Sequence, residues 1–461
     1  MKVKHIINTS LMCATAAMLS TSCTFEQEDY FDESASLRIT HLNEDIQSRL
    51  VNQSTGENNG WVIQYFVAGT DEMDFEGFNL FGRFYKNNTV TLASNHRYLR
   101  NGNANKYTEH TSHYEMLAEE GPVLSFNTWN DILTVFEDPV SPSSAPGRIE
   151  QDGVGMNGDH NLVLKSYNEN EIVFRGERHS ALVRFVPCDR SFEEYIAAVN
   201  EFKSKYTSTT LNNYYVTNGT DTMYFAGLNK GLFGYYDRIN DPLKRKTLSC
   251  VFTPNGFLLN RVDSLGSQTF QEFTIAEDRT KLLSEDGQTQ VIACWDSYVA
   301  ECPSDWRLDP NKFTAEQTNL YQKMEAEVQK VSGWKLDSLC IGNKTETKTD
   351  GTKVNYHALL AYAHGPARMG RVPIIKPYIY IDFGKAAFGE MTISQSSETK
   401  TSDDMATFAE TDLKNLCEQF AATIYGRYYI EPNDLFRPTY ADLIPVNTGN
   451  PIGLRLKKIV D

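Results

Sequence analysis

The chain alternates between segments with helical and with strand-like spacing of hydrophobic residues. Apolar residues recur every three or four positions in four segments, which predicts amphipathic helices there. These segments are 34–52, one that begins at Ser191, one that begins at Thr314, and 404–425. Ser191 with Glu194, and Thr314 with Gln317, have the spacing of a capping box, which predicts where the second and third helices begin.

Short strand-like runs lie between the first two predicted helices, and turn residues separate them. Phe78–Tyr85 and Thr89–Ala93 flank Asn87-Asn88, a pair that tolerates the positive φ of a tight turn. The other runs are 61–66, 113–117, 123–126, 132–136, 162–167, 172–175 and 181–186. Short strands joined by frequent turns predict an antiparallel meander of the sandwich or barrel type, and no strand–helix alternation indicates a parallel sheet.

We predict an α+β fold of helix-plus-antiparallel β-meander units, sandwich-like or barrel-like, in two or three domains. Each of the first three predicted helices precedes strand-like sequence, such as Trp61–Phe66 and the segment after Gly333-Trp334. Without the predicted leader of 22 residues, the remaining 439 of the 461 residues suit roughly three domains of about 150 residues. The predicted division is 1–22 (signal peptide), 23–33 (acidic tether), 34–190 (N-terminal helix plus antiparallel β domain), 191–305 (middle helix plus β domain) and 306–461 (C-terminal α+β domain).

The first 23 residues have the pattern of an export signal. Lys2 and Lys4 precede an apolar stretch over 11–19, and the small residues 20–22 lead into Cys23. The stretch is shorter than the 20 or so residues of a membrane-spanning helix. A cysteine in this position resembles the acylated cysteine of a bacterial lipoprotein, so we predict lipidation of Cys23. The alternative is a secreted protein without a lipid.

The chain is acidic, with 60 Asp and Glu against 44 Lys and Arg and a formal charge of −16. Loss of Lys2 and Lys4 with the leader makes the charge −18. Such a chain repels polyphosphates, so we expect no nucleic-acid partner. Six cysteines remain after Cys13 and Cys23, without the spacing of a metal site. Cys294 and Cys302 are the closest pair and the best candidates for a disulfide, whereas free buried cysteines are the alternative.

Three tryptophans are the candidate ligand-binding residues. Trp129, Trp295 and Trp306 lie near predicted loops or strand ends, where an exposed aromatic face can stack on a sugar ring. The alternative for each is an ordinary place in the sheet core. Trp61 and Trp334 follow helices at strand starts, and we expect them in the core.

The remaining patterns do not predict a cofactor, a metal or a catalytic residue. The glycines of 153–158 match a nucleotide-binding spacing but lack the strand before and the helix after that it requires. His96, His110 and His113 read as loop histidines rather than metal ligands, and the acids 71, 72, 74 and 76 lack the spacing of a calcium loop. No nucleophile motif or assignable carboxylate pair is present, so we expect no enzyme.

Three stretches together resemble a known family: residues 121–130, 136–139 and Gly158-Asp159. They are similar to Bacteroidetes lipoproteins catalogued as domain of unknown function 4302, over about residues 20–190. The resemblance implies a surface lipoprotein beside a SusC/SusD-type nutrient-uptake system, and no catalytic residues. The acidic stretch 24–33 resembles the export tag of surface lipoproteins. Thr222, Ser264 and Ser338 resemble the Asp-Ser/Thr-aliphatic acceptor of Bacteroides O-glycosylation.

We therefore expect a lipid-anchored protein of the outer membrane that faces the cell exterior. Its expected role is non-catalytic capture of a glycan or peptide for a SusC/SusD-like importer. A structural or assembly lipoprotein that binds a protein partner is one alternative, and a hydrolase is another.

Overall fold

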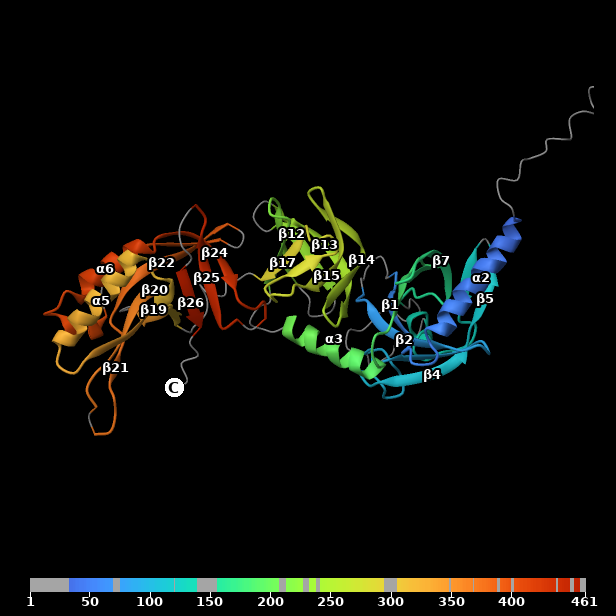
Figure 1. The fold of residues 1–461 in the computed structure, drawn as a ribbon, viewed down its shortest axis with the longest axis horizontal. Coiled ribbons are helices and arrows are strands. Elements are labelled where there is room, and N and C mark those ends of the chain that lie inside the picture. Colours follow the sequence, from blue (N-terminus) through green and yellow to red (C-terminus); the bar gives the residue numbers. More distant parts are fainter. Residues whose placement is uncertain are drawn as a thin grey trace, which may run out of the picture.

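The computed structural model describes residues 33–68, 75–119, 121–138, 156–206, 213–226, 232–237, 241–293, 305–347, 350–367, 369–387, 390–398, 402–436, 438–447 and 452–456. These residues form three antiparallel sheet units that follow one another along an elongated molecule (Figure 1). Each unit has a helix or a pair of helices packed against it. The order of the units in space is their order in the chain.

The first unit is a nine-stranded sheet that curls around one hydrophobic core. Its strands lie in the order β4-β3-β2-β1-β9-β8-β7-β6-β5. Helix α2 (Ala35–Asn52) is capped by Ser34 and buries Ile46, Leu50 and Val51 in this core. The strands are β1 (Trp61–Phe66), β2 (Phe78–Phe84), β3 (Thr89–Ser94), β4 (Thr108–His113), β5 (Glu115–Ala118), β6 (Pro122–Ser125), β7 (Asn161–Tyr167), β8 (Ile172–Gly176) and β9 (Leu182–Pro187). A short 3₁₀ helix, η1 (Thr134–Phe136), lies between β6 and β7.

The second unit is a closed barrel, because its last strand pairs with its first. Helix α3 (Phe192–Tyr206) precedes the barrel and bridges two cores: Phe192 and Tyr195 pack on the first unit, and Phe202 and Tyr206 pack on the barrel core. The strands are β10 (Asn213–Thr217), β11 (Thr222–Ala226), β12 (Leu232–Asp237), β13 (Asp241–Thr253), β14 (Gly256–Leu265), β15 (Gln268–Ile275), β16 (Leu282–Ser284) and β17 (Gln290–Ala293).

The third unit is a second nine-stranded sheet, in the order β19-β18-β26-β25-β24-β23-β22-β20-β21, and a β19–β20 pairing joins its ends. Helices α5 (Ala315–Lys330) and α6 (Leu413–Thr423) pack together on this sheet (Figure 1). The strands are β18 (Trp306–Leu308), β19 (Lys335–Thr347), β20 (Lys353–His364), β21 (Ile374–Ile375), β22 (Tyr378–Ala387), β23 (Glu390–Gln395), β24 (Gly426–Pro432), β25 (Tyr440–Pro445) and β26 (Ile452–Leu456), and the 3₁₀ helices are η3 (Pro310–Lys312) and η4 (Asp403–Phe408).

The predicted α+β class is wrong, because the fold is β-rich. Strand accounts for 44% of the chain and helix for 21%. The three sheets curl on themselves and enclose their own cores, so the helices cover sheets and do not form a separate layer. The helices themselves were predicted correctly from their apolar periodicity. The prediction gave them too large a fraction of the fold, because strands such as β13 and β19 reach 13 residues.

The predicted helix starts are confirmed by their capping contacts. The Thr314 side chain accepts from the Gln317 N–H (3.2 Å), and the Gln317 side chain accepts from the Thr314 N–H (2.9 Å). Ser191 and Glu194 make the same reciprocal bonds. The fourth predicted helix, 404–425, is wrong at its start, where η4 and a break at Thr411-Asp412 precede α6.

The first two units join through a close seam. The Gly77 N–H donates to the Cys250 carbonyl (2.9 Å), where a Cβ on residue 77 would lie 2.4 Å from the Phe66 ring. Phe66 packs with Val251 and Leu258 of the barrel. The Arg184 guanidinium of β9 also donates to Glu272 of β15 (2.7 Å). These contacts hold the two units as neighbours.

Candidate ligand-binding site

The loop that follows β6 places the most exposed tryptophan described in the structure. Asn130 anchors this loop and is fully buried. Its amide donates to the His110 carbonyl (3.2 Å) and to the Ser112 hydroxyl (2.9 Å), and its carbonyl oxygen accepts from the Ile132 N–H (3.0 Å). Because this anchor bonds to β4, the loop is tied to the sheet directly after Trp129.

Trp129 lies on the surface with half of its side chain exposed (51%). Its indole N–H donates to Asp131 Oδ1 (2.6 Å), and Asp131 Oδ2 pairs with His110 Nδ1 (3.0 Å). The hydrogen bond from Trp129, with His110 in addition, holds the pKa of Asp131 below its usual value. Asp131 therefore stays ionised and fixes the orientation of the ring, which leaves an indole face open to solvent.

Polar side chains join the loop of Trp129 to β4 and β5. Asn127, Thr128, His113 and Glu115 are all exposed. The Asn127 amide donates to Glu115 Oε2 (3.2 Å), and the Thr128 hydroxyl accepts from the His113 N–H (2.9 Å). An oriented aromatic face with hydrogen-bonding groups beside it can stack on a sugar ring and bond its hydroxyls. We call Trp129 and these four residues the Trp129 platform.

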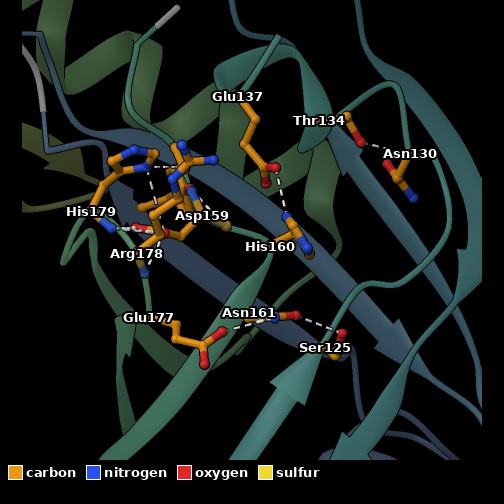
Figure 2. Close-up of polar contacts among 12 residues, drawn as sticks. Ser125, Asn130, Thr134, Glu137, Asp159, His160, Asn161, Glu177, Arg178 and His179 are labelled. Atoms are coloured by element: carbon orange, nitrogen blue, oxygen red, sulfur yellow. Dashed lines mark hydrogen bonds and ion pairs between the residues drawn. The ribbon is translucent and has the colours of Figure 1, made fainter.

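In the same unit, a buried carboxylate organises the loop between β8 and β9 (Figure 2). Asp159 is 4% exposed and accepts from the N–H groups of Arg178 (3.0 Å), His179 (3.0 and 3.1 Å) and Ala181 (3.2 Å). Gly176 makes room for this carboxylate, because a Cβ there would lie 1.9 Å from Asp159 Oδ2. Three backbone donors on one carboxylate fix the course of this loop.

Tyr65 ties the same segment to the centre of the sheet. Its hydroxyl accepts from the Asp159 N–H (2.7 Å) and donates to the Asp159 carbonyl (3.0 Å). Its ring stacks on Phe136 at 5.2 Å between centroids, and the Phe136 carbonyl accepts from the Gly158 N–H (3.1 Å). Complete burial raises the pKa of Tyr65, so the hydroxyl stays protonated. Two of the three stretches that carry the family resemblance, 136–139 and Gly158-Asp159, therefore meet here.

Glu137 and His160 form an ion pair beside this network and point toward each other (Figure 2). His160 Nδ1 lies 2.6 Å from Glu137 Oε2. Burial raises the pKa of Glu137, and the contact with His160 opposes this shift. The nearby Ser125 hydroxyl bonds to Asn161 rather than to the histidine (2.7 Å). The pair therefore fixes the start of β7, and it lacks the hydroxyl-to-imidazole contact of a nucleophilic site.

The tryptophans predicted to bind a ligand differ in their exposure. Trp129 is exposed, but Trp306 is 1% exposed, because β18 lies between β19 and β26 and directs the indole into the core of the third unit. The ligand role predicted for Trp306 is therefore not supported. Trp295, Cys294, Cys302 and Cys23 lie outside the described residues.

The other tryptophans and cysteines lie in or against cores. Trp61 is buried, and Trp334 packs on Phe408. The four described cysteines are buried: Cys188, Cys250, Cys340 and Cys417.

The histidines and acids set aside above occupy separate places. His96 is buried against Phe78 and Phe136, His110 pairs with Asp131, and His113 is exposed. Glu76 pairs with Arg97 (3.0 Å), whereas acids 71, 72 and 74 lie outside the described residues. Glycines 153 and 155 also lie outside them, and no cluster of three or more metal-binding side chains occurs in the described part of the chain.

The three hydroxyls with the glycosylation pattern differ in exposure. Ser264 is exposed, and Thr222 is half-buried with its hydroxyl bonded to Thr217 (2.7 Å). Ser338 is 3% exposed and its hydroxyl lies 3.7 Å from Cys340 Sγ, so modification there is not supported. The Asn218 amide donates to the Leu265 carbonyl (2.9 Å), which brings the turns of Thr222 and Ser264 to the same end of the barrel.

Reasoning from the sequence missed Asn130, Tyr65 and Asp159 as organisers of the site. Gly158-Asp159 was noticed only as part of the resemblance. The sequence otherwise gave little indication of the role of Asp159, because this residue follows a glycine and belongs to no recognisable motif.

Comparison with known proteins places the chain in a family. No curated protein matches it, and no helix among the described residues is long and apolar enough to cross a membrane. A family profile matches residues 27–277, which extends the expected similarity beyond residue 190 into the barrel. The match covers more than half of the 461 residues. The chain belongs to the family described as "Domain of unknown function (DUF4302)".

Proposed function

We propose that this protein is a non-catalytic ligand-binding lipoprotein of the outer membrane, anchored through Cys23 and facing the cell exterior. In this proposal it captures a ligand for a SusC/SusD-like uptake system. The observation that carries the proposal is the Trp129 platform: an indole 51% exposed and held by a 2.6 Å hydrogen bond to Asp131. A ring fixed before binding loses little conformational entropy when a ligand stacks on it.

A glycan fits this platform better than an apolar peptide. The C–H face of a sugar ring stacks on an indole, and its hydroxyls need donors and acceptors at the rim. Asn127, Thr128, His113 and Glu115 supply both kinds of group. An apolar peptide would leave these groups without partners when they lose water.

Affinity electrophoresis tests the glycan-binding role. The chain from Thr24 onward, which keeps every described residue, is run through gels that contain a panel of soluble polysaccharides. We expect retention by at least one polysaccharide and at least about tenfold weaker binding for Trp129→Ala, because a stacked aromatic with its area burial contributes on the order of 2 kcal/mol.

Tyr440→Ala is the matched control, because it removes a comparably exposed aromatic (40%) from the third unit. Its binding should equal that of the unaltered chain. Equal retention of Trp129→Ala and the unaltered chain, or no retention by any polysaccharide, would contradict the glycan role. Co-purification of a stoichiometric protein partner without glycan binding would favour an assembly lipoprotein instead. Intact mass of the native protein tests the acyl groups on Cys23 separately.

A further inference from the structure

A hairpin of the third unit presents apolar side chains to solvent at the far end of the molecule. Of the large hydrophobic residues described as exposed, three lie in this hairpin: Met369 (105%), Val372 (52%) and Ile374 (63%). In Figure 1 the hairpin at β21 extends away from the body of the sheet. Apolar side chains that gather in the solvent mark a surface for interaction.

The base of the hairpin is held in place. His364 pairs with Ile374 and Ala363 pairs with Ile375, and the Gly365 N–H donates to the Pro373 carbonyl (2.9 Å). Lys376 then anchors the returning strand, because its N–H donates to Asp404 Oδ2 (2.8 Å) and its ammonium group lies 3.4 Å from Asp305. The apolar tip is therefore carried on a fixed arm.

The charge around the tip contrasts with the rest of the chain. Over residues 364–376 the sequence contains no Asp or Glu and three basic residues, Arg368, Arg371 and Lys376. The ammonium group of Lys376 is already beside Asp305, so Arg371 is the basic group that the described tip presents. The whole chain has a formal charge of −16. Arg371 is exposed between the apolar side chains. The acidic body is repelled by an anionic surface, whereas this hairpin is attracted to one.

We propose that the described part of this hairpin tip (residues 369–374) inserts into the surface of an anionic phospholipid bilayer. Met369, Val372 and Ile374 would enter the boundary between headgroups and acyl chains, and Arg371 would pair with lipid phosphates. The size of the tip favours a bilayer over a protein partner, because a stable protein interface needs about 800 Å² on each side. A few apolar side chains with adjacent basic groups suffice for interfacial binding.

This contact is independent of the Trp129 platform. A lipid at Cys23 would keep the tip at high effective concentration near the bilayer, so even a weak contact would be populated.

Vesicle flotation of the chain from Thr24 onward, which cannot carry the Cys23 lipid, tests the proposal. The probes are vesicles of phosphatidylcholine alone and of phosphatidylcholine with phosphatidylglycerol. We expect binding to the anionic vesicles that weakens as salt is raised, and at least about tenfold loss in the triple variant Met369→Ser, Val372→Ser, Ile374→Ser. Arg371→Glu should also reduce binding to the anionic vesicles.

The matched control is the triple variant Leu37→Ser, Val262→Ser, Tyr440→Ser, which removes exposed apolar side chains elsewhere. Its binding should equal that of the unaltered chain. The proposal is overturned if the chain floats with neither vesicle, or if the hairpin variant floats as well as the control. It is also overturned if the hairpin variant changes only the oligomeric state measured by light scattering, which would identify a second copy of the chain as the partner.

Discussion

Replacement of Asp159 by alanine is the sharpest test of the loop network. The substitution removes the acceptor of three backbone N–H groups, those of Arg178, His179 and Ala181. The Ala181 N–H is buried, whereas the Arg178 N–H belongs to an exposed residue and can bond to water. A hydrogen bond to a charged group contributes about 1.5–3 kcal/mol, and a buried donor without a partner costs about 1–3 kcal/mol.

The structure therefore predicts that Asp159→Ala destabilises the β8–β9 hairpin by roughly 2–4 kcal/mol. The loop also contains Ser180 at φ 62°, a conformation unfavourable for a residue with a side chain, which the bonds to Asp159 help to maintain. Asp159→Asn keeps one acceptor oxygen in the same place and should cost less than Asp159→Ala.

Hydrogen exchange followed by mass spectrometry is the suitable assay, because it measures one hairpin rather than the whole three-unit chain. Peptides over residues 172–187 should lose about 30- to 1,000-fold of protection in Asp159→Ala, as 1.4 kcal/mol corresponds to a factor of about ten. Asp131→Ala, which removes an exposed carboxylate of the neighbouring loop, is the control and should leave these peptides unchanged. Protection in Asp159→Ala within about fivefold of the unaltered chain would refute the reasoning.

Two further predictions concern stability. Burial lowers the pKa of His96 to about 4 from its usual 6.5. As the pH drops, the unfolded chain therefore binds a proton at this residue before the folded chain does. The free energy of unfolding should fall by up to roughly 3 kcal/mol between about pH 6.5 and pH 4. Denaturant unfolding across this pH range measures how the free energy of unfolding depends on pH. His96→Gln should weaken this dependence, and an equal dependence in both proteins would contradict the assignment to His96. Gly342→Ala places a Cβ 1.8 Å from Asp305 Oδ1 and should lower the melting temperature by several degrees. Gly121→Ala, which meets open space, should leave it unchanged, and equal effects of the two would count against the steric argument.

Local patterns in the sequence were enough to predict the helix starts and several turns. The capping residues Thr314 and Gln317 act within one turn of helix, so their spacing alone carries the information. Asn88 adopts φ 60° in the turn between β2 and β3, as its residue type suggests. A place near a loop was also compatible with the exposure of Trp129, but the same argument was wrong for Trp306.

Features that depend on distant pairings could not be predicted in this way. Trp306 follows a loop and begins a short strand, but it is buried because Leu456, far along the chain, pairs with it. Asp159 finds its partners about 20 residues later, in a loop with no pattern that indicates a carboxylate contact. The β-rich class likewise depends on closure of the sheets, which the periodicity of single strands does not report.

Closure of the barrel has a practical consequence for work on this family. The profile match ends at residue 277, before β16 and β17, although β17 pairs with β10 and β16 pairs with β15. A fragment cut at that residue would leave two strands with unsatisfied backbone groups, which invites aggregation. Expression of the matched portion should therefore extend at least to Ala293.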